Sequence, residues 1–345
     1  MTDQNSTESP VFAPRHTGVV RVLVSPGEVG PFSSDEAAQA LGEGVGEIIR
    51  NADIVLAPLS AGGAGTSELF TGERVTLPTT DAVGSLTEAT YTYDRDTATA
   101  YIDLAAAAGF PDTDKATETG DTYGVGVLVA DAQTRGAERV VLALGDALTV
   151  DGGTGILVAL AANPVNADGH PVPKGGAFLE QVADLETAKL NIPAAGMEWI
   201  LLADSAAGVD TSHPGLASLA RAAGVDPGQP GWGAGGGVAI GLAWVSSLIY
   251  GTAHRVRVLR GVDVVAQSLA VDAHATEADF VISAGAAGQA VIRLAPEATV
   301  GIAGEAVEGA AVQAGLPEEI VSLAQLRQAG AQLAADYLRI STVQG

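Results

Sequence analysis

The stretch VVRVLVSPGEVGPFSSDEAAQALGEGVGEIIRNADIVLAPLSAGGAGT, residues 19–66, decides how the chain begins to fold. Its first part, VVRVLVS (Val19–Ser25), is an apolar run that predicts a buried strand. A helix is predicted over Ser33–Arg50, with Ser34 as the N-cap and acidic residues in the first turn. A second apolar run, Asp53–Ser60, leads into the loop AGGAGT. Strand, helix, strand and glycine-rich loop in this order indicate an α/β sheet of parallel strands.

The pattern changes between Glu73 and Asp103 and then returns to α/β. Thr, Val and Tyr are frequent in this region and partly alternate, which predicts antiparallel strands and hairpins. Beyond it we predict a helix near Gly124–Arg135 and a C-terminal helix that opens at Pro317. Further strands are predicted at 139–144, 198–204, 279–285 and 298–304. The fold class is therefore α/β: a Rossmann-like, doubly wound parallel-sheet domain plus a smaller inserted α/β domain that contains antiparallel strands.

The domain limits follow from these changes of pattern. Residues 1–17 are polar and contain proline, with no positively charged start and no apolar run, so we expect a disordered lead-in and no signal peptide. The Rossmann-like domain is expected over 18–72 and 265–345, and the inserted domain over 73–264. One uncharged segment, Pro227–Ala253, raises the question of a membrane span. Its first third is too rich in Gly and Pro for a helix, and the remainder is too short to span a bilayer, so a buried helix is predicted there.

Composition excludes several classes of function. The 345 residues carry a formal net charge of −24, which disfavours binding to nucleic acid or to anionic membranes. The chain has no cysteine, so disulfides, thiolate nucleophiles and zinc–sulfur sites are ruled out. We expect a cytoplasmic protein without membrane insertion. The sequence does not indicate an oligomeric state.

Four glycine-rich loops follow predicted strands or precede helices, at Gly62–Gly63, Gly152–Gly153, Gly233–Gly237 and Gly285–Gly288. Glycine loops at helix N-termini bind anions through backbone N–H groups, although glycine also simply permits tight turns. GWGAGG, starting at Gly231, formally matches the dinucleotide motif GxGxxG. DPGQP precedes it in place of a strand, so the structural context of that motif is missing.

Taken in order, these segments resemble the glycerate kinase family of two-domain α/β proteins, from about Val19 onward. VLVSPGEVGPFSSDEAAQAL is similar to the family's strand–PDSFKGSLSA–EAA opening, and LAPLSAGGAGTSEL to PxADGGEGT. LGDALTVDGGTG (Leu144–Gly155) is similar to GGSATNDGGAG, and GWGAGGGVA to GAGAAGGLG. IDLAAAAGF, DTYGVGVLV, ADSAAG and ADFVISAG are similar to further family segments. The resemblance implies transfer of the ATP γ-phosphate to glycerate in a cleft between the two domains, with Mg·ATP as the cofactor.

The departures from the family pattern fall at positions that carry chemistry. Where the family has Asp, Ser and Lys in its opening motif, and Asp and Glu in its second loop, this chain has apolar residues or glycine: Pro26, Gly27, Val29, Ala61 and Ala64. In the 144–155 segment the family's Gly-Ser is replaced by Asp146-Ala147 and its Asn by Val150, whereas Thr149 and Asp151-Gly152-Gly153 agree. Asp204 also agrees, but Ala206, Ala207 and Gly208 follow it.

Near the C-terminus two alignments are open. Gln289 matches the family Gln and puts Leu294 at the Lys, or the loop is deleted and Arg293 already lies in the following helix. The residues expected to serve catalysis, and possible ligands of Mg²⁺, are Asp151 and Asp204. The residues expected to contact a ligand are Thr149, Gly152, Gly153, Gly62, Gly63, Thr66, Gly235, Gly236, Gln289 and Arg293.

Two functional hypotheses follow from this pattern. Phosphoryl transfer needs cations near the phosphates and a carboxylate for the metal, and the three lysines, Lys115, Lys174 and Lys189, all lie outside the glycine loops. The first hypothesis is therefore a non-catalytic family member that binds an unidentified protein or small molecule. The second is an active kinase for glycerate or a related small hydroxy acid, using Asp151, Asp204, Thr149 and backbone groups, with Arg293 in place of Lys. A third, unrelated α/β function such as an oxidoreductase is distinguished by NAD(P) binding.

Overall fold

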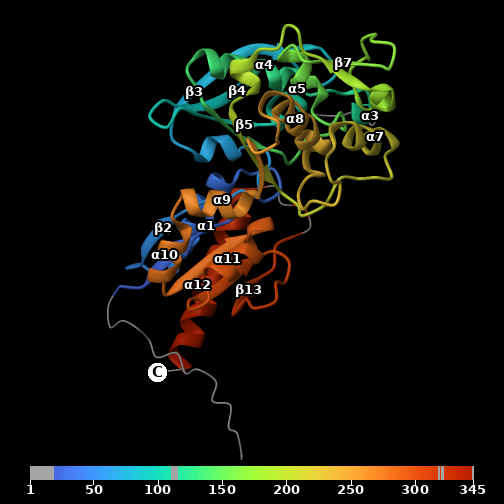
Figure 1. Cartoon of the computed structure of the whole chain (residues 1–345). Helices are drawn as coiled ribbons and strands as arrows, with labels where there is room; N and C mark the ends of the chain where they lie inside the picture. The colour runs from blue at the N-terminus through green and yellow to red at the C-terminus, as the bar shows by residue number, and fades with distance from the viewer. Residues whose placement is uncertain (1–18, 110–115, 318, 320–321, 344–345) are drawn as a thin grey trace, which may run out of the picture. The chain divides into compact units, whose positions relative to one another are not determined.

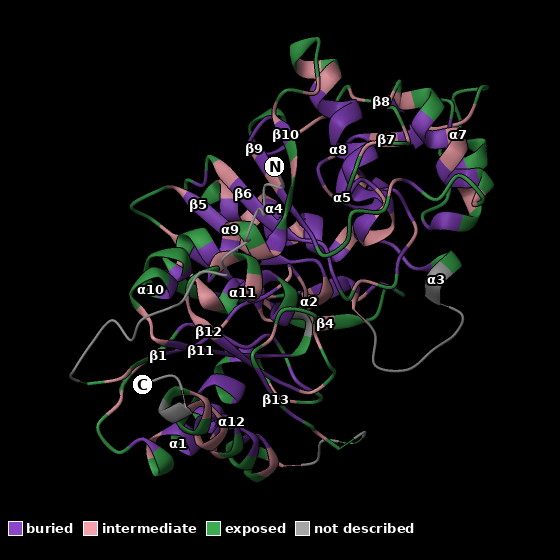
Figure 2. Ribbon diagram, turned by 90° about the horizontal axis from the view of Figure 1, so that it is seen from below, coloured by how far each residue is buried: buried purple, intermediate pink, exposed green. Residues whose placement is uncertain are grey.

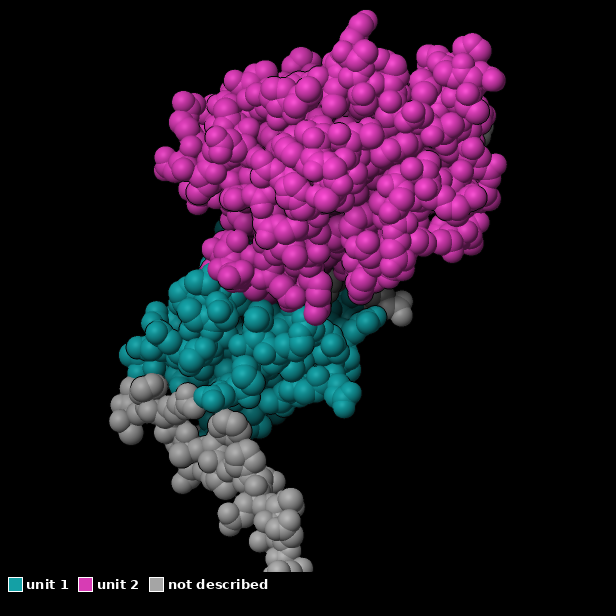
Figure 3. Space-filling view, in the orientation of Figure 1, with its two compact units in different colours: residues 1–58, 270–345 teal, residues 59–269 magenta. Residues whose placement is uncertain are grey.

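The computed structural model describes residues 19–109, 116–317, 319 and 322–343 (Figure 1). The expected lead-in, residues 1–17, lies outside these described residues. The chain divides into two compact units (Figure 3). Unit 1 comprises Met1–Pro58 and Ala270–Gly345, and unit 2 is the continuous segment Leu59–Leu269. The inserted unit is thus the larger of the two, and not the smaller as expected.

Unit 1 is built on a five-stranded sheet in the order β13-β12-β11-β1-β2, in which every neighbouring pair is parallel. Its strands are β1 (Arg21–Val24), β2 (Asp53–Leu56), β11 (Phe280–Ala284), β12 (Thr299–Ala303) and β13 (Val312–Ala314). The chain first builds outward from β1 to β2 and then returns to build the other side from β11, which is the order of a doubly wound sheet. The expected Rossmann-like, doubly wound parallel sheet is confirmed.

Helices cover both faces of this sheet. Figure 2 shows α1 (Ser34–Ile48) and α12 (Leu323–Val343) on one face, and α10 (Val271–Glu277) and α11 (Gly288–Leu294) on the other. The N-cap of α1 is Ser33 and not the expected Ser34, because the Ser33 side chain accepts the Glu36 amide while the Glu36 carboxylate accepts the Ser33 amide.

The packing of α1 against α12 depends on glycine. A methyl group on Gly44 would overlap the backbone carbonyl of Arg327, and one on Gly330 would overlap that of Leu41. The two helices therefore lie closer together than any larger residue at these positions would allow. Helix α12 begins at Leu323, six residues after the proline at which the sequence predicted its start.

Unit 2 contains a six-stranded mixed sheet in the order β10-β9-β6-β5-β4-β3. Its strands are β3 (Glu73–Thr80), β4 (Leu86–Asp94), β5 (Thr99–Asp103), β6 (Arg139–Ala143), β9 (Glu198–Ala203) and β10 (Val256–Arg260). The β3–β4 and β4–β5 pairs are antiparallel, whereas β5, β6, β9 and β10 run parallel. The predicted antiparallel region at 73–103 and the strands predicted after it are confirmed.

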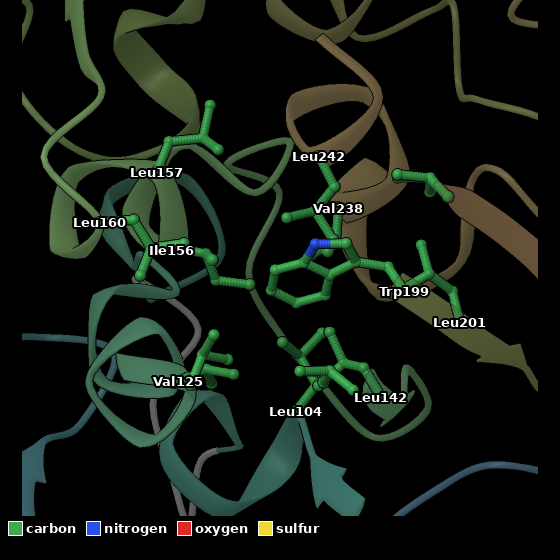
Figure 4. Packing of buried hydrophobic residues seen from close by; sticks show 14 of the residues in the cluster. Leu104, Val125, Leu142, Ile156, Leu157, Leu160, Trp199, Leu201, Val238 and Leu242 are labelled. Atoms are coloured by element: carbon green, nitrogen blue, oxygen red, sulfur yellow. The ribbon is translucent and has the colours of Figure 1, made fainter. Parts of the chain in front are cut away.

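Helices and a small second sheet complete unit 2. The elements are η1 (Thr66–Leu69), α2 (Ala105–Ala108), α3 (Ala116–Thr119), α4 (Tyr123–Thr134), α5 (Thr154–Ala159), β7 (Asn163–Val165), η2 (Gly176–Gln181), β8 (Asp184–Glu186), α6 (Ile192–Ala195), α7 (Pro214–Ala223), α8 (Ala234–Tyr250) and α9 (Gly261–Ser268). The core gathers around the fully buried Trp199 of β9 (Figure 4). Helix α8 is the predicted buried helix of the uncharged segment. No helix in the described part of the chain combines the length and apolar character needed to cross a bilayer.

Candidate active site

Chemically active side chains gather where the parallel strands of unit 2 end. Strand β5 ends at Asp103, β6 is followed by Gly145 and Asp146, β9 by Asp204, and β10 ends at Arg260. The parallel register places these ends at one edge of the sheet, with Asp103 opposite Ala143 and Arg260 opposite Ala203. Ligands of open α/β sheets bind at this carboxyl edge, so we take it as the candidate site.

A glycine loop, residues 60–67, lies on this edge and is closed by its own side chains. The Ser60 and Thr66 hydroxyl oxygens are 2.5 Å apart, and the Thr66 hydroxyl donates to the carbonyl of Gly63 at 2.6 Å. The Gly62 amide in turn donates to the Ser60 hydroxyl at 3.0 Å. Thr66 was expected to contact a ligand, but its buried side chain is used to shape the loop.

The glycine loop is also fastened to the strand ends beneath it. The Gly145 amide donates to the carbonyl of Gly62 at 2.8 Å, and the Ala64 amide donates to Oδ2 of Asp146 at 2.8 Å. Gly62 has φ +106°, and a methyl group there would lie 2.7 Å from the carbonyl oxygen of Leu202. Only glycine fits this approach without strain. Gly62 and Gly63 therefore bring backbone, and no side chain, to the edge of the sheet.

Asp146 and Asp204 form a pair of exposed carboxylates beside the loop. A methyl group at Gly145 would lie 3.1 Å from Oδ2 of Asp204, so this carboxylate lies over the same glycine that precedes Asp146. Asp146 has φ +59°, a left-handed conformation that costs energy for a residue other than glycine. In the sequence Asp146 stands at the position of a family glycine, and its place just beyond a buried strand is the signal that could have identified it.

Asp151 occupies a different environment from Asp204. Its side chain is fully buried, and its carboxylate accepts four hydrogen bonds. The donors are the amide and hydroxyl of Thr122, each at 2.9 Å, and the amides of Gly153 and Gly155 at 3.0 and 2.8 Å. Burial raises the pKa of Asp151, while the backbone donors act in the opposite direction. The carboxylate links the start of α5 to the start of α4 and is enclosed by protein.

Another glycine-rich segment, Gly235–Gly237 at the start of α8, packs on the loop that carries Asp151. All three residues have positive φ, at 57°, 64° and 80°. A methyl group on Gly236 would overlap the backbone carbonyl of Thr149, and the Gly152 amide donates to the carbonyl of Gly236 at 3.0 Å. The structure therefore brings the predicted residues Thr149, Gly152, Gly153, Gly235 and Gly236 together, as a backbone-to-backbone contact. The Thr149 hydroxyl is buried there without a hydrogen-bond partner.

The two remaining predicted residues, Gln289 and Arg293, belong to unit 1. Both lie on α11 and both are exposed. Leu294, the other candidate for the lysine position, ends the same helix. The loops at the carboxyl ends of β1 and β11 meet directly, because the Gly27 amide donates to the carbonyl of Ala284 at 2.9 Å.

Few side chains at the carboxyl edge are available to bind a metal ion. Within the described residues no group of three or more His, Asp or Glu side chains is placed to hold a metal ion. Mg²⁺, however, is commonly held by one or two carboxylates together with substrate phosphates and water. The exposed pair Asp146 and Asp204 fits that requirement. Asp151 fits it poorly, because its oxygens already serve four donors.

One cation lies at the same edge and was missed in the sequence. Arg260 ends β10, and the next residue, Gly261, packs so closely on the glycine loop that a methyl group would overlap the carbonyl of Ala61. The Arg260 guanidinium lies 3.7 Å from the carboxylate of Asp263. Lys174, by contrast, is held by Asp121 at 2.9 Å beside α4. Arg260 cannot be recognised as a site residue from the sequence, because its place at this edge depends on the order of the strands in the sheet.

Comparison with known proteins gives a consistent picture. The model of the glycerate kinase family matches residues 29–212. A glycerate kinase of Halalkalibacterium halodurans is 32% identical over 163 residues, 45% of this chain and 43% of that protein. The glycerate 2-kinase of Escherichia coli is 30% identical over 167 residues, 46% of this chain and 44% of that protein. The matched part thus spans less than half the length of these curated relatives.

A longer match and a solved structure extend the comparison. An uncharacterized protein of Mycobacterium bovis is 29% identical over 249 residues, 65% of this chain and 61% of that protein. A crystal structure from Salmonella typhimurium, of a protein provisionally designated glycerate kinase 2, superposes with a TM-score of 0.75. It covers 94% of this chain and 100% of the other chain at 22% identity, so it shows a shared fold.

Proposed function

Because this chain belongs to the glycerate kinase family, we propose that it is a member whose phosphotransfer is lost or strongly impaired, and that it acts as a binding protein. The observation that carries the proposal is a contrast between backbone and side chains. The glycine loops have tight backbone conformations with positive φ, at Gly62 on the carboxyl edge and at Gly236 against Thr149. By the resemblance, the charged side chains of the family are replaced by Pro26 and Val29 in the opening motif and by Ala61 beside Gly62.

The physical reason is the charge that phosphoryl transfer develops. The reaction depends on cations that hold and neutralise the transferred group, and loss of a single such contact costs about 10²–10³ in rate. The position that the resemblance gives to a lysine in the opening motif holds Val29. Asp151, which agrees with the family, has its carboxylate enclosed by four donors and serves the fold. The ligand of the proposed binding role is a small hydroxy acid such as glycerate, a related small molecule or a protein.

A second candidate, an active kinase for glycerate or a related hydroxy acid, is favoured by one specific arrangement. Asp146 and Asp204 are exposed beside Gly145, and Arg260 ends the neighbouring strand. In that reading the two carboxylates hold Mg²⁺, whose charge offsets the phosphate oxygens of ATP. Arg260 supplies a second positive charge at the same edge. Without the metal, the carboxylates would repel ATP.

The deciding experiment measures ADP release from Mg·ATP in the presence of D-glycerate, with an active family member as the positive control. The proposal expects no release above background from folded protein, together with a thermal shift on adding glycerate or Mg·ATP. Asp204→Asn should reduce that shift, whereas Asp210→Asn, an exposed aspartate in the loop before α7, serves as the matched control and should leave it unchanged. Turnover that Asp204→Asn abolishes would overturn the binding role and establish the kinase. A shift with NAD(P) alone would instead indicate an oxidoreductase.

A further inference from the structure

A buried carboxylate lies directly beneath the glycine loop, and neither functional candidate uses it. Asp103, the last residue of β5, is only 6% exposed. Its Oδ1 accepts the amide of Ser67 at 2.8 Å, and its Oδ2 accepts the Ser67 hydroxyl at 2.9 Å. A third hydrogen bond holds Ser67: the Thr92 hydroxyl of β4 donates to its carbonyl at 2.7 Å. Ser67 is thus one point at which the loop is fastened to the sheet.

We propose that Asp103 is the positioning residue of the glycine loop, and that release of its two bonds to Ser67 lets residues 60–67 lift from the carboxyl edge. Lifting the loop breaks the bond from the Ala64 amide to Asp146 and the bond from the Gly145 amide to Gly62. The strained backbone of Asp146 then loses a contact that holds it. Asp103 therefore sets the geometry of the exposed carboxylate pair without itself facing a ligand.

The charge state of Asp103 gives this fastening a pH dependence. Burial raises the pKa of Asp103 to about 6 from 3.8, although its bonds to Ser67 and to the backbone of Gly65 act in the opposite direction. Glu68 raises it slightly, and the charge of Glu68 is offset by its ion pair with Arg74 at 2.7 Å. The residue opposite Asp103 on β6 is the uncharged Ala143, and Thr92, the β4 residue that contacts Ser67, is also uncharged.

The direction of the pH dependence is set by the difference in the pKa of Asp103 between the docked loop and the lifted loop. In the lifted loop Asp103 meets water and has its ordinary pKa, so the docked loop binds a proton more readily. Docking is therefore strongest at low pH and weakens as the pH rises through about 6. Protonation does not break the contact, because the Ser67 hydroxyl can accept a hydrogen bond from the protonated carboxyl as well as donate to its ionised form. Between pH 7 and pH 5 the docking equilibrium should change by about tenfold.

The test is hydrogen–deuterium exchange of the protein without ligand, at pH 5 and pH 7, corrected for intrinsic exchange rates. Its reporters are the amides of Ala64 and Ser67, each of which donates to an acceptor outside the loop and loses that acceptor when the loop lifts. In the wild type their protection should be about tenfold higher at pH 5 than at pH 7. The measurement needs no catalytic activity, so its result is independent of the proposed function.

Three variants make the test specific. Asp103→Asn keeps both bonds to Ser67, because its amide oxygen accepts and its amide nitrogen donates, and it should abolish the pH step. Ser67→Ala removes the hydroxyl bond and should lower protection of residues 60–67 at both pH values, with β6 peptides unchanged. Asp81→Asn alters a carboxylate that caps the β3–β4 turn and should retain the wild-type step. A wild-type loop with equal protection at pH 5 and 7, a step that persists in Asp103→Asn, or a Ser67→Ala protein with an unchanged loop would each overturn the proposal.

Discussion

Substitution of Asp151 by asparagine changes one oxygen of an enclosed carboxylate to an amide nitrogen and tests whether this residue serves the fold. Oδ2 accepts three hydrogen bonds, two from Thr122 and one from Gly155, and Oδ1 accepts one from Gly153. The favourable orientation of the new side chain keeps its oxygen toward the three donors. Its nitrogen then faces the Gly153 amide, which loses its acceptor.

The loss of unfolding free energy in Asp151→Asn depends on these four hydrogen bonds. A buried donor left without a partner costs about 1–3 kcal/mol, and the three remaining bonds weaken because their acceptor is no longer charged. Asparagine carries no charge, so the variant avoids the cost of burying an ionised carboxylate, which raises the pKa of Asp151 in the wild type. This gain offsets part of the lost unfolding free energy. We expect a net loss of about 2 kcal/mol for Asp151→Asn. Asp151→Ala leaves all four donors unpaired and should cost about 4 kcal/mol or more.

The assay is urea unfolding followed by tryptophan fluorescence. All three tryptophans, Trp199, Trp232 and Trp244, lie in unit 2, so this signal reports the unit that contains Asp151. Asp204→Asn is the matched control, because its exposed side chain should contribute within about 0.5 kcal/mol of zero. If Asp151→Asn unfolded at the same urea concentration as the wild type, the four hydrogen bonds to Asp151 would not stabilise unit 2.

Three further predictions concern single positions. Gly236→Ala should lower the stability of unit 2 by about 2 kcal/mol or more in the tryptophan assay, because its left-handed φ is strained for alanine and its methyl group would overlap the Thr149 carbonyl. Gly44→Ala should destabilise unit 1 by about 1–3 kcal/mol, measured by far-ultraviolet circular dichroism, and should leave the tryptophan transition unchanged. Gly46→Ala is the control and should be tolerated, because its methyl group would make only an ordinary contact at 3.8 Å. Between pH 7 and pH 5 the wild type should gain about 1 kcal/mol of unfolding free energy relative to Asp103→Asn, since a raised carboxyl pKa stabilises the folded state at low pH; equal pH profiles would contradict this.

The order of strands and helices could be predicted largely from the sequence, because burial imposes periodicities that survive in the chain. The apolar run at β6 and the alternating Thr, Val and Tyr residues of β4 are both visible without a structure. The cap of α1 was also accessible, since Ser33 and Glu36 have the spacing of a capping box, but the neighbouring Ser34 competes for the same role.

The candidate site was only partly predictable, because its residues come together through strand order. Asp146 and Arg260 are separated by more than 100 residues along the chain, yet Asp146 lies just beyond the end of β6 and Arg260 ends β10, at the same sheet edge. Asp151 shows the opposite difficulty. An aspartate before paired glycines has the same sequence signature whether it faces a ligand or accepts a hydrogen bond from a threonine 29 residues earlier.

The insertion of unit 2 into unit 1 has a consequence for the order in which the protein matures on the ribosome. Val22 of β1 pairs with Phe280 of β11, so the central pair of the first sheet cannot form until the whole inserted segment has been translated. At about 5–20 residues per second, β1 and β2 wait roughly 10–45 s for that partner. Unit 2 emerges as one uninterrupted segment and can fold during this interval. The N-terminal strands of this chain thus complete their fold last, although they are synthesised first.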